Sequence, residues 1–254
     1  MSTASNLPYL CLAHVFHYLS LNDIRACMQV CRHWYSYFAI EDCDIWKILV
    51  EEKLPSGALL DPYLLSSLPT AKSKLRAYAH AWNPADCSRN AYIKLNGFTL
   101  HRNPVAQSTD GVRAKRGFKV GRHAWEVWWD GPLGTVALVG VATQHAALQS
   151  HGYSPLLGSD DQGWAWNLVD NTLLHNGHAV QPYPRVNNAP RYQVGDRVRI
   201  ILDCDDHLIY YERNYEFLGV AFWDLPPLKL YPCACAVYGN TEVSMVYLGA
   251  PFDG

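Results

Sequence analysis

The chain has 254 residues, of which 49% are hydrophobic and 17% charged, and its formal net charge is -2. This length allows one large domain or two smaller ones, and the near-neutral charge gives no global preference for nucleic acid or anionic membranes. No apolar run approaches the ~18 residues that cross a bilayer, and the polar first residues are unlike a signal peptide. We therefore expect a cytosolic or nuclear protein without membrane insertion.

The first eighty residues carry apolar side chains at helical spacing. Leu12, Val15, Phe16 and Leu19 follow the i, i+3, i+4, i+7 pattern of one helix face. Pro8 suits the opening turn of this helix, where a missing N–H costs little. The pattern predicts a short amphipathic helix.

A second stripe follows in the same spacing. Cys27, Val30, Cys31 and Trp34 repeat the pattern, and Asn22 is the predicted cap of their helix. Helices this short are marginal in isolation, so they need tertiary packing or a partner helix.

Two further helices are predicted before residue 83. One lies around residues 45–49, and the other carries a stripe from Leu75 to Trp82, where Asn83-Pro84 ends it. Residues 55–69 are rich in Leu, Ser and Pro without a clear period, which is typical of a connector.

The motifs in this helical segment resemble an F-box. Leu7-Pro8 is followed by "VFHYL", then by Asp23-Ile24 and by "VCRHW". The resemblance implies a small all-α module that binds a Skp1-like adaptor through its apolar face. The family often has an acidic residue after Leu-Pro, where this chain has Leu10-Cys11. The contact residues that the resemblance implies are Leu7, Pro8, Leu12, Val15, Phe16, Leu19, Val30 and Trp34.

From Cys87 onward the pattern changes to short strands with turn signals between them. Trp125, Val127 and Trp129 alternate with their neighbours, and Asn176-Gly177 is a strong hairpin turn. Because no long helices interleave, we expect an antiparallel sandwich or barrel. The other predicted strands cover residues 136–141, 164–166, 198–202, 208–211, 218–222, 230–238 and 243–248.

The order of these segments resembles a SPRY domain, which implies a B30.2-like antiparallel sandwich. The matching segments include "GRHAWEVWW", "VALVGVAT", "LGSDDQGWAW" and "LYPCACAV". Within that family, "FTLHRNPVAQSTDGVRAKRGF" and "HGYSPLLG" are most similar to the SPRY-domain SOCS-box proteins, which bind short asparagine-rich peptides in a pocket made by loops. The residues that match this pocket are Arg102, Pro104, Ala106, Gln107, Tyr153, Leu156, Val237, Tyr238 and Gly239.

The chemistry of these residues suits peptide capture. An arginine fork can hold a carboxylate or backbone carbonyls, and tyrosines give rigid apolar walls with a polar tip. An alternative for Arg102 is an ion pair with Asp110 across a loop. Tyr238 stands where the related receptors commonly carry tryptophan. Five tryptophans are predicted to pack in the core or on a sheet face: Trp125, Trp128, Trp129, Trp164 and Trp166.

The sequence contains no recognisable catalytic motif. It lacks a Gly-x-Ser-x-Gly elbow, a Walker loop and His-Glu-x-x-His. The paired carboxylates at 160–161 and 205–206 are typical of solvated turns. Because no Cys-x-x-Cys pair occurs, the eight cysteines are interpreted as buried thiols rather than metal ligands. We therefore expect no enzymatic activity, no metal and no cofactor.

Together the two motifs resemble the F-box/SPRY-domain family of synapses. The predicted organisation is an F-box module at 1–52, a connector with a helix at 53–82 and a SPRY sandwich at 83–254. The resemblance implies a substrate-recognition or bridging subunit of an E3 ubiquitin ligase in the cytoplasm of presynaptic terminals, regulating synapse growth and neuromuscular junctions. Its implied partners are a Skp1-like adaptor, a large RING-type ligase and a protein substrate with a short linear motif.

Three alternatives remain open at this stage. The chain could be a scaffold or cofactor that stabilises a large RING ligase without substrate degradation. The tryptophans and carboxylate pairs would also suit a glycan-binding or hydrolytic β-sandwich. Finally, the basic run at 113–122 could bind RNA, although a solvated loop is the simpler interpretation of it.

Overall fold

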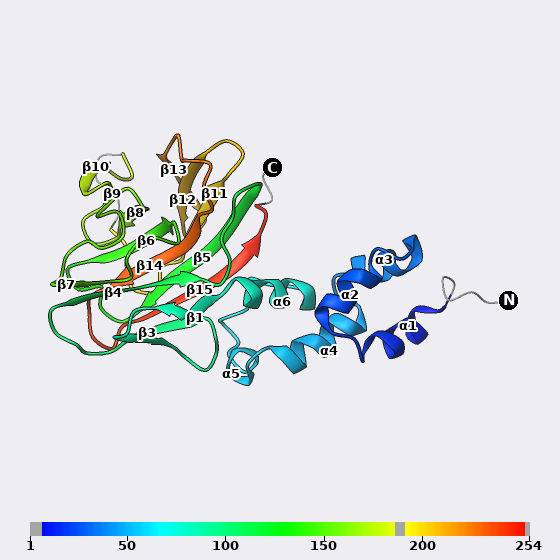
Figure 1. Ribbon diagram of the computed structural model, residues 1–254. Helices are drawn as coiled ribbons and strands as arrows, with labels where there is room; N and C mark the ends of the chain where they lie inside the picture. The colour runs from blue at the N-terminus through cyan, green and yellow to red at the C-terminus, as the bar shows by residue number, and fades with distance from the viewer. Residues whose placement is uncertain (1–6, 186–190, 252–254) are drawn as a thin grey trace. The chain divides into compact units, whose positions relative to one another are not determined.

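The computed structural model describes residues 7–185 and 191–251. The chain separates into two compact units, Met1–Arg76 and Ala77–Gly254. Figure 1 shows helices in the first unit and strands in the second. This confirms the predicted class, a small all-α module followed by an all-β antiparallel domain. The finer boundaries predicted from sequence stay a prediction.

From residue 7 onward, where the structure describes it, the helical unit contains five complete helices and most of a sixth. The element α6 crosses the division between the units, so its last residues belong to the second unit. The helices are α1 Tyr9–Phe16, α2 Leu21–Cys27, α3 Arg32–Ala39, α4 Asp44–Lys53, α5 Ser56–Leu59 and α6 Ala71–His80.

The second predicted helix is two helices in the structure. The element α2 ends at Cys27, and Cys31 has extended backbone angles immediately before α3 begins, so the stripe from Cys27 to Trp34 does not lie on one helix. The predicted cap at Asn22 is also wrong. Ser20 caps α2 instead: its hydroxyl accepts from the Asp23 N–H, and the Asp23 carboxylate accepts from the Ser20 N–H.

A cluster of aromatic rings forms the core of this unit. The ring of Phe16 lies 4.8 Å from Phe38 and 5.0 Å from Trp34, measured between centroids. The indole N–H of Trp46 donates to the Phe38 carbonyl oxygen at 3.2 Å. Because the chain is not helical at Cys31, α3 can direct its aromatic rings onto Phe16. Tertiary packing therefore outweighs the local apolar spacing that predicted one continuous helix.

The helix predicted to end at Trp82 ends at His80 instead. Trp82 opens the first strand, is fully buried, and donates its indole N–H to the Val243 carbonyl oxygen at 3.0 Å. The residue before a proline favours an extended backbone, so Asn83 before Pro84 continues as strand rather than helix. Trp82, which was predicted to end a helix, therefore belongs to the β unit.

Within the described residues, the β unit consists of two antiparallel sheets (Figure 1). One sheet has the order β1-β4-β14-β6-β8-β9-β10, with β7 paired to β4, and the other has the order β13-β12-β11-β5-β15-β3-β2. The strands are β1 Trp82–Cys87, β2 Ala91–Ile93, β3 Thr99–Arg102, β4 Ser108–Ala114, β5 Arg122–Asp130, β6 Ala137–Ala142, β7 Gln149–His151, β8 Gly163–Asn167, β9 Thr172–His175, β10 His178–Pro182, β11 Val198–Asp203, β12 Leu208–Arg213, β13 Glu216–Phe222, β14 Tyr231–Ala236 and β15 Glu242–Gly249.

Every strand predicted from alternation is present, within a few residues at each end. The hairpin at Asn176-Gly177 is confirmed, since both residues have positive φ and join β9 to β10. Several strands before residue 115 were not predicted. The clearest case is β4, which is buried at every position although its sequence, Ser108–Ala114, is largely polar.

The predicted packing role of the five tryptophans is confirmed. Trp125 and Trp129 have no exposed surface, Trp166 has 1%, and Trp164 and Trp128 have 6% and 9%. Their rings therefore stabilise the sandwich by removing apolar area from water. They do not form an exposed platform for a sugar ring.

Candidate functional site

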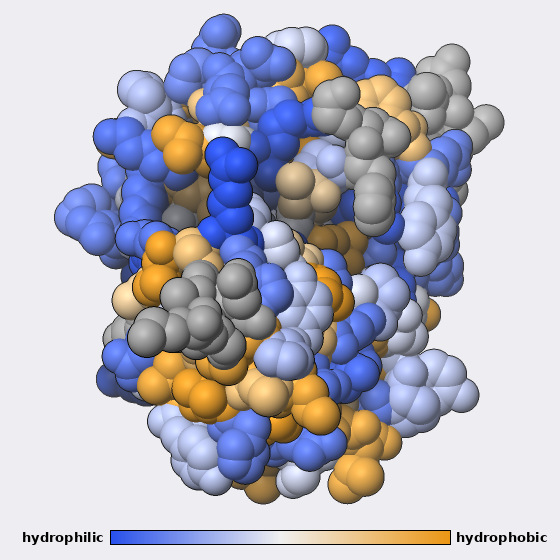
Figure 2. Space-filling model, turned by 90° about the vertical axis from the view of Figure 1, so that its right-hand side faces the viewer, coloured by the Kyte–Doolittle hydropathy of each residue, from blue (hydrophilic) through white to orange (hydrophobic). Residues whose placement is uncertain are grey.

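The helical unit exposes apolar side chains on α1 and in the turns that follow α1 and α2. Val15 and Val30 are 51% and 62% exposed, and Leu10 and Tyr18 are 78% and 75% exposed. Hydrophobic residues, orange in Figure 2, are visible on the face of this unit that is turned toward the viewer. Large apolar side chains left in water mark an interaction surface.

The structure divides the eight predicted adaptor-contact residues into two groups. Leu12 and Phe16 are 0% and 1% exposed, so they form the core beneath the face rather than the face itself, which differs from the prediction. The other six retain exposed surface: Leu7, Pro8, Val15, Leu19, Val30 and Trp34.

A groove lies beside this face, and the sequence analysis did not predict it. The groove has a volume of about 310 Å³, and its lining residues include Leu10 and His14 of α1 and Ile48 of α4. Leu10 departs from the family motif, and that departure was the available signal. Its side chain is 78% exposed and adds apolar surface to the groove.

In the β unit, the loops bring seven of the nine predicted peptide-contact residues to one open cavity of about 440 Å³. Residues that lie more than 130 positions apart in the chain therefore share its wall, as a loop-built site requires. The seven are Arg102, Pro104, Ala106, Tyr153, Val237, Tyr238 and Gly239.

Three loops supply these residues, and glycine allows two of them to meet. Gly239 follows β14 and lies against Pro104, which follows β3; a Cβ atom at Gly239 would lie 2.8 Å from the Pro104 Cα. Real side chains do not approach that closely, so glycine is required for this contact. The contact closes one side of the cavity.

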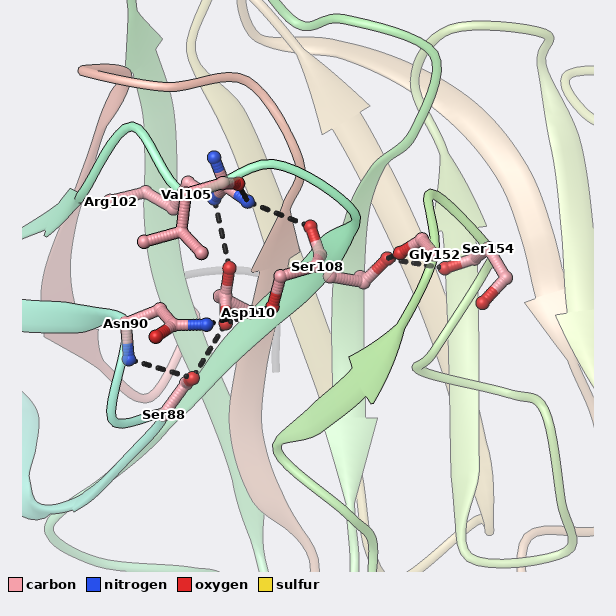
Figure 3. A network of polar contacts seen from close by, with 9 residues as sticks. Ser88, Asn90, Arg102, Val105, Ser108, Asp110, Gly152 and Ser154 are labelled. Carbon is pink, nitrogen blue, oxygen red and sulfur yellow. Dashed lines mark hydrogen bonds and ion pairs between the residues drawn. The ribbon is translucent and has the colours of Figure 1, made fainter.

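A buried polar network holds the wall of the cavity (Figure 3). The Arg102 guanidinium donates through Nε to the Asp110 carboxylate at 2.9 Å, and the two side chains are only 2% and 0% exposed. The hydroxyls of Ser88 and Ser108 donate to the other Asp110 oxygen at 2.7 and 2.9 Å. The carboxylate is thus fully paired, which a buried charge requires.

Arg102 also fixes the loop that follows β3. Its Nη2 donates to the carbonyl oxygens of Val105 and Ser108, at 2.6 and 2.8 Å. The predicted alternative, an ion pair with Asp110, is therefore confirmed. These hydrogen bonds use Nε and Nη2, while Arg102 still lines the cavity. Of its donor nitrogens, Nη1 is the one that these three bonds leave for a ligand.

The loop that carries Tyr153 is held by a hydroxyl from β4. The buried Thr109 Oγ1 lies 2.9 Å from both the Gly152 and the Ser154 carbonyl oxygens and shares its proton between them. Tyr153 between these residues is 45% exposed, and Tyr238 is 47% exposed. Both rings are therefore available to a ligand.

Two predicted contact residues do not line the cavity. The Gln107 backbone has positive φ, and its carbonyl oxygen accepts from the Gly152 N–H at 2.9 Å, so it joins two of the loops. Leu156 is 6% exposed and belongs to the hydrophobic core. The lining residues that were missed are Val105, Gly134 and Thr135. Val105 lies between two predicted residues, and Gly134 ends a Gly-Pro-Leu-Gly turn signal.

The basic run at 113–122 is mostly committed to the fold. Arg113 pairs with Asp86 at 2.7 Å, Arg122 pairs with Asp203 at 3.0 Å, and Lys115 donates to the Tyr78 carbonyl oxygen at 3.0 Å. Burial lowers the pKa of Lys115 below its ordinary value. A phosphate-binding patch needs free cations, so these contacts disfavour RNA binding through this run.

The cysteine side chains are less uniformly buried than predicted. Cys43, Cys233 and Cys235 are buried, whereas Cys11 is exposed. Burial, together with Asp110 and Asp86, raises the pKa of the Cys87 thiol to about 12. This thiol is therefore protonated at neutral pH, where a nucleophile would need the thiolate.

Comparisons with known proteins agree with both units. Residues 4–51 match the F-box-like model and residues 122–249 match the SPRY domain model. The SPRY domain of human HERC1 aligns with a TM-score of 0.53 over 65% of this chain and 97% of that one, at 19% identity. That similarity concerns the fold alone.

Two relatives of high identity match almost the whole of this chain. An F-box/SPRY domain-containing protein 1 of Anopheles gambiae is 61% identical over 100% of this chain and 98% of its own length. That of Caenorhabditis elegans is 59% identical over 99% of this chain and 76% of its own length.

An F-box-like module joined to a SPRY domain defines a class of protein whose role is that of an adaptor in ubiquitin ligation. The chain belongs to the family of F-box/SPRY domain-containing proteins. None of the helices in the described residues has the length and apolar character that a bilayer crossing requires.

Proposed function

We propose that this protein is a substrate-recognition or bridging subunit of an E3 ubiquitin ligase and has no catalytic chemistry of its own. The exposed face of the helical unit would bind a Skp1-type adaptor, and the loop cavity of the β unit would hold a short segment of a second protein. The observation that carries the proposal is the cavity itself, in which Arg102 is fixed by buried partners and two tyrosines stay exposed.

The proposed mechanism is proximity. A target lysine held near a charged conjugating enzyme experiences a raised effective concentration, and this by itself accelerates transfer. Because the Arg102 charge is neutralised by Asp110, the cavity favours an uncharged segment that offers a backbone carbonyl to Nη1 and apolar groups to Tyr153 and Tyr238.

Family membership extends the proposal to its biological setting. The resemblance to the synaptic members of the family supports a large RING-type ligase as a further partner and regulation of synapse growth at presynaptic terminals as the process. If the cavity holds a substrate, the protein directs that substrate to degradation. If it holds the ligase, the protein acts as a scaffold. Comparing the half-lives of cavity-bound proteins with and without this chain distinguishes the two.

The test uses affinity purification of the full chain from cells that express it. Replacing Val15 and Val30 by Asp should remove the Skp1-type adaptor and keep the cavity-bound proteins, because both side chains are exposed. Replacing Tyr153 and Tyr238 by Ala should do the reverse. The control is Tyr92→Ala, since Tyr92 is 50% exposed on β2 and does not line the cavity. An unchanged set of bound proteins in either double variant would contradict the corresponding half of the proposal.

A further inference from the structure

A second groove lies on the β unit, away from the loop cavity. It has a volume of about 660 Å³ and runs over strands β12 and β13, and the loop cavity shares none of its lining residues. The element β13 is an edge strand of its sheet in the described residues. The function proposed above assigns no role to this groove.

Aromatic rings form part of the groove. Phe217 on β13 is 60% exposed, and its ring meets that of Tyr210 on β12 edge to face, with centroids 5.4 Å apart and planes at 75°. Leu208 and Val220 also line this surface. A fixed pair of rings surrounded by aliphatic groups and left in solvent is the arrangement expected of a surface that a partner covers.

The rim of the groove is negatively charged. Its lining residues carry four carboxylates and one guanidinium, that of Arg122. Arg122 is paired with Asp203 at 3.0 Å, and Glu212 is paired with Arg199 at 3.1 Å. The two carboxylates that remain belong to Asp205 and Asp206, both exposed in the turn between β11 and β12. One Asp205 oxygen accepts from the Gly121 N–H at 2.8 Å, which fixes this turn and leaves its second oxygen toward the groove.

The backbone edge of β13 is partly occupied by the protein itself. The Tyr183 hydroxyl donates to the Gly219 carbonyl oxygen at 2.6 Å, and the Gln181 side-chain amide donates to the Ala221 carbonyl oxygen at 3.5 Å. Addition of a further strand would have to displace these contacts. Recognition in this groove therefore depends on side chains rather than on backbone pairing.

We propose that this groove is a second protein-binding surface and that it takes a segment carrying a lysine or arginine next to an apolar residue. The cation lies over the Tyr210 and Phe217 rings and beside the carboxylates of Asp205 and Asp206, while the apolar neighbour covers Leu208 and Val220. Charge complementarity selects this occupant, because an acidic segment or a nucleic-acid phosphate meets repulsion here. The surface is distinct from the uncharged loop cavity, so one β unit can hold two protein segments.

The test measures the binding of a fluorescent peptide of alternating lysine and leucine to the full chain by anisotropy. The reference probe is the matching peptide of alternating glutamate and leucine. Asp206→Lys should weaken binding of the lysine probe about tenfold, and Phe217→Ala should weaken it several-fold. The matched control is Asp161→Lys, an exposed turn aspartate outside the groove, which changes the net charge equally and should alter the affinity less than about twofold.

Three results would overturn the proposal. Equal weakening by Asp206→Lys and Asp161→Lys would mean nonspecific attraction to the whole protein. Loss of probe binding in Tyr238→Ala would place the probe in the loop cavity instead. Concentration-dependent dimers in sedimentation that Phe217→Ala abolishes would show that a second copy of this chain covers the groove. Retained binding in Tyr238→Ala with loss in Phe217→Ala supports the proposal, whatever the outcome for the adaptor function.

Discussion

The helical unit leaves large apolar side chains in solvent on its proposed binding face, whereas the β unit builds its cavity around buried polar groups. In the helical unit, exposed Val15 lies beside fully buried Leu12 and Phe16 on the same short helix. In the β unit, buried Arg102 both lines the cavity and holds the loop that forms it. The difference suggests that binding and folding depend on separate residues in the first unit and on shared residues in the second.

The largest expected effect follows from removing the charge partner of Arg102. Asp110→Ala leaves a buried guanidinium and two serine hydroxyls without their acceptor, so we expect the β unit to lose about 3–5 kcal/mol of stability. The cavity should lose its bound proteins at the same time. Denaturant unfolding of the full chain, followed by hydrogen exchange in β4, measures the change.

The control for this change is Asp161→Ala, which removes an exposed carboxylate of the same unit and should cost less than about 0.5 kcal/mol. Similar stabilities for Asp110→Ala and Asp161→Ala would contradict the contrast between the two units, because the β unit would then not depend on the buried pair of Arg102 and Asp110.

The next effect concerns the core of the helical unit. Leu12→Ala removes a fully buried side chain, and we expect a loss of about 2–4 kcal/mol that is confined to this unit. Val15→Ala on the same helix should change stability by less than about 0.5 kcal/mol, since half of its surface is already exposed. Hydrogen exchange of α1 and α4 compares the two variants. A larger loss for Val15→Ala would contradict the separation of face and core.

A smaller effect is expected from the hydroxyl that positions the Tyr153 loop. Thr109→Val keeps the shape of the side chain but loses the contacts to Gly152 and Ser154, which should cost about 1 kcal/mol. Retention of the cavity-bound proteins should decrease as well, because Tyr153 becomes less well held. Thr143→Val, which removes a buried hydroxyl bonded to Gln162 away from the cavity, should cost similar stability but leave that retention unchanged. Equal retention in the two variants would argue against a positioning role for Thr109.

The smallest effect is a pH dependence of the β unit. Burial lowers the pKa of His123 below its ordinary value, although the Val120 carbonyl and Asp205 act in the opposite direction. A histidine with a lowered pKa binds its proton more readily in the unfolded chain, so its contribution is fully present above about pH 6.5 and is lost as the pH falls through the folded pKa.

Thermal unfolding between about pH 7.5 and about pH 5.5 measures this dependence. His123→Phe keeps a ring against Phe118, 3.7 Å away between centroids, and should flatten the decline of the β-unit transition. An equally steep decline in this variant would assign the acid sensitivity to other groups.

Most of the fold could be predicted from particular residues, and the exceptions have physical causes. Alternation at Trp125, Val127 and Trp129 was sufficient for β5, because one face of that strand packs against the sandwich core. The polar strand β4 gave no such signal, since its Asp110 finds its partners Ser88, Arg102 and Ser108 only when the chain is folded. The apolar stripe across Cys31 predicted one continuous helix. In the structure this helix is interrupted at Cys31, because α3 packs its Trp34 ring onto Phe16.

The sequence alone determined the class of each unit, the switch of pattern near residue 83 and most residues of the loop cavity, because these depend on local periodicity and on family motifs. The tertiary structure decided that Arg102 is a buried ion-pair partner as well as a wall residue, and that Leu12 and Phe16 lie beneath the exposed apolar face of the helical unit. It also revealed the acidic groove on β12 and β13. Burial and charge pairing join residues far apart in the chain, so no local pattern can specify them.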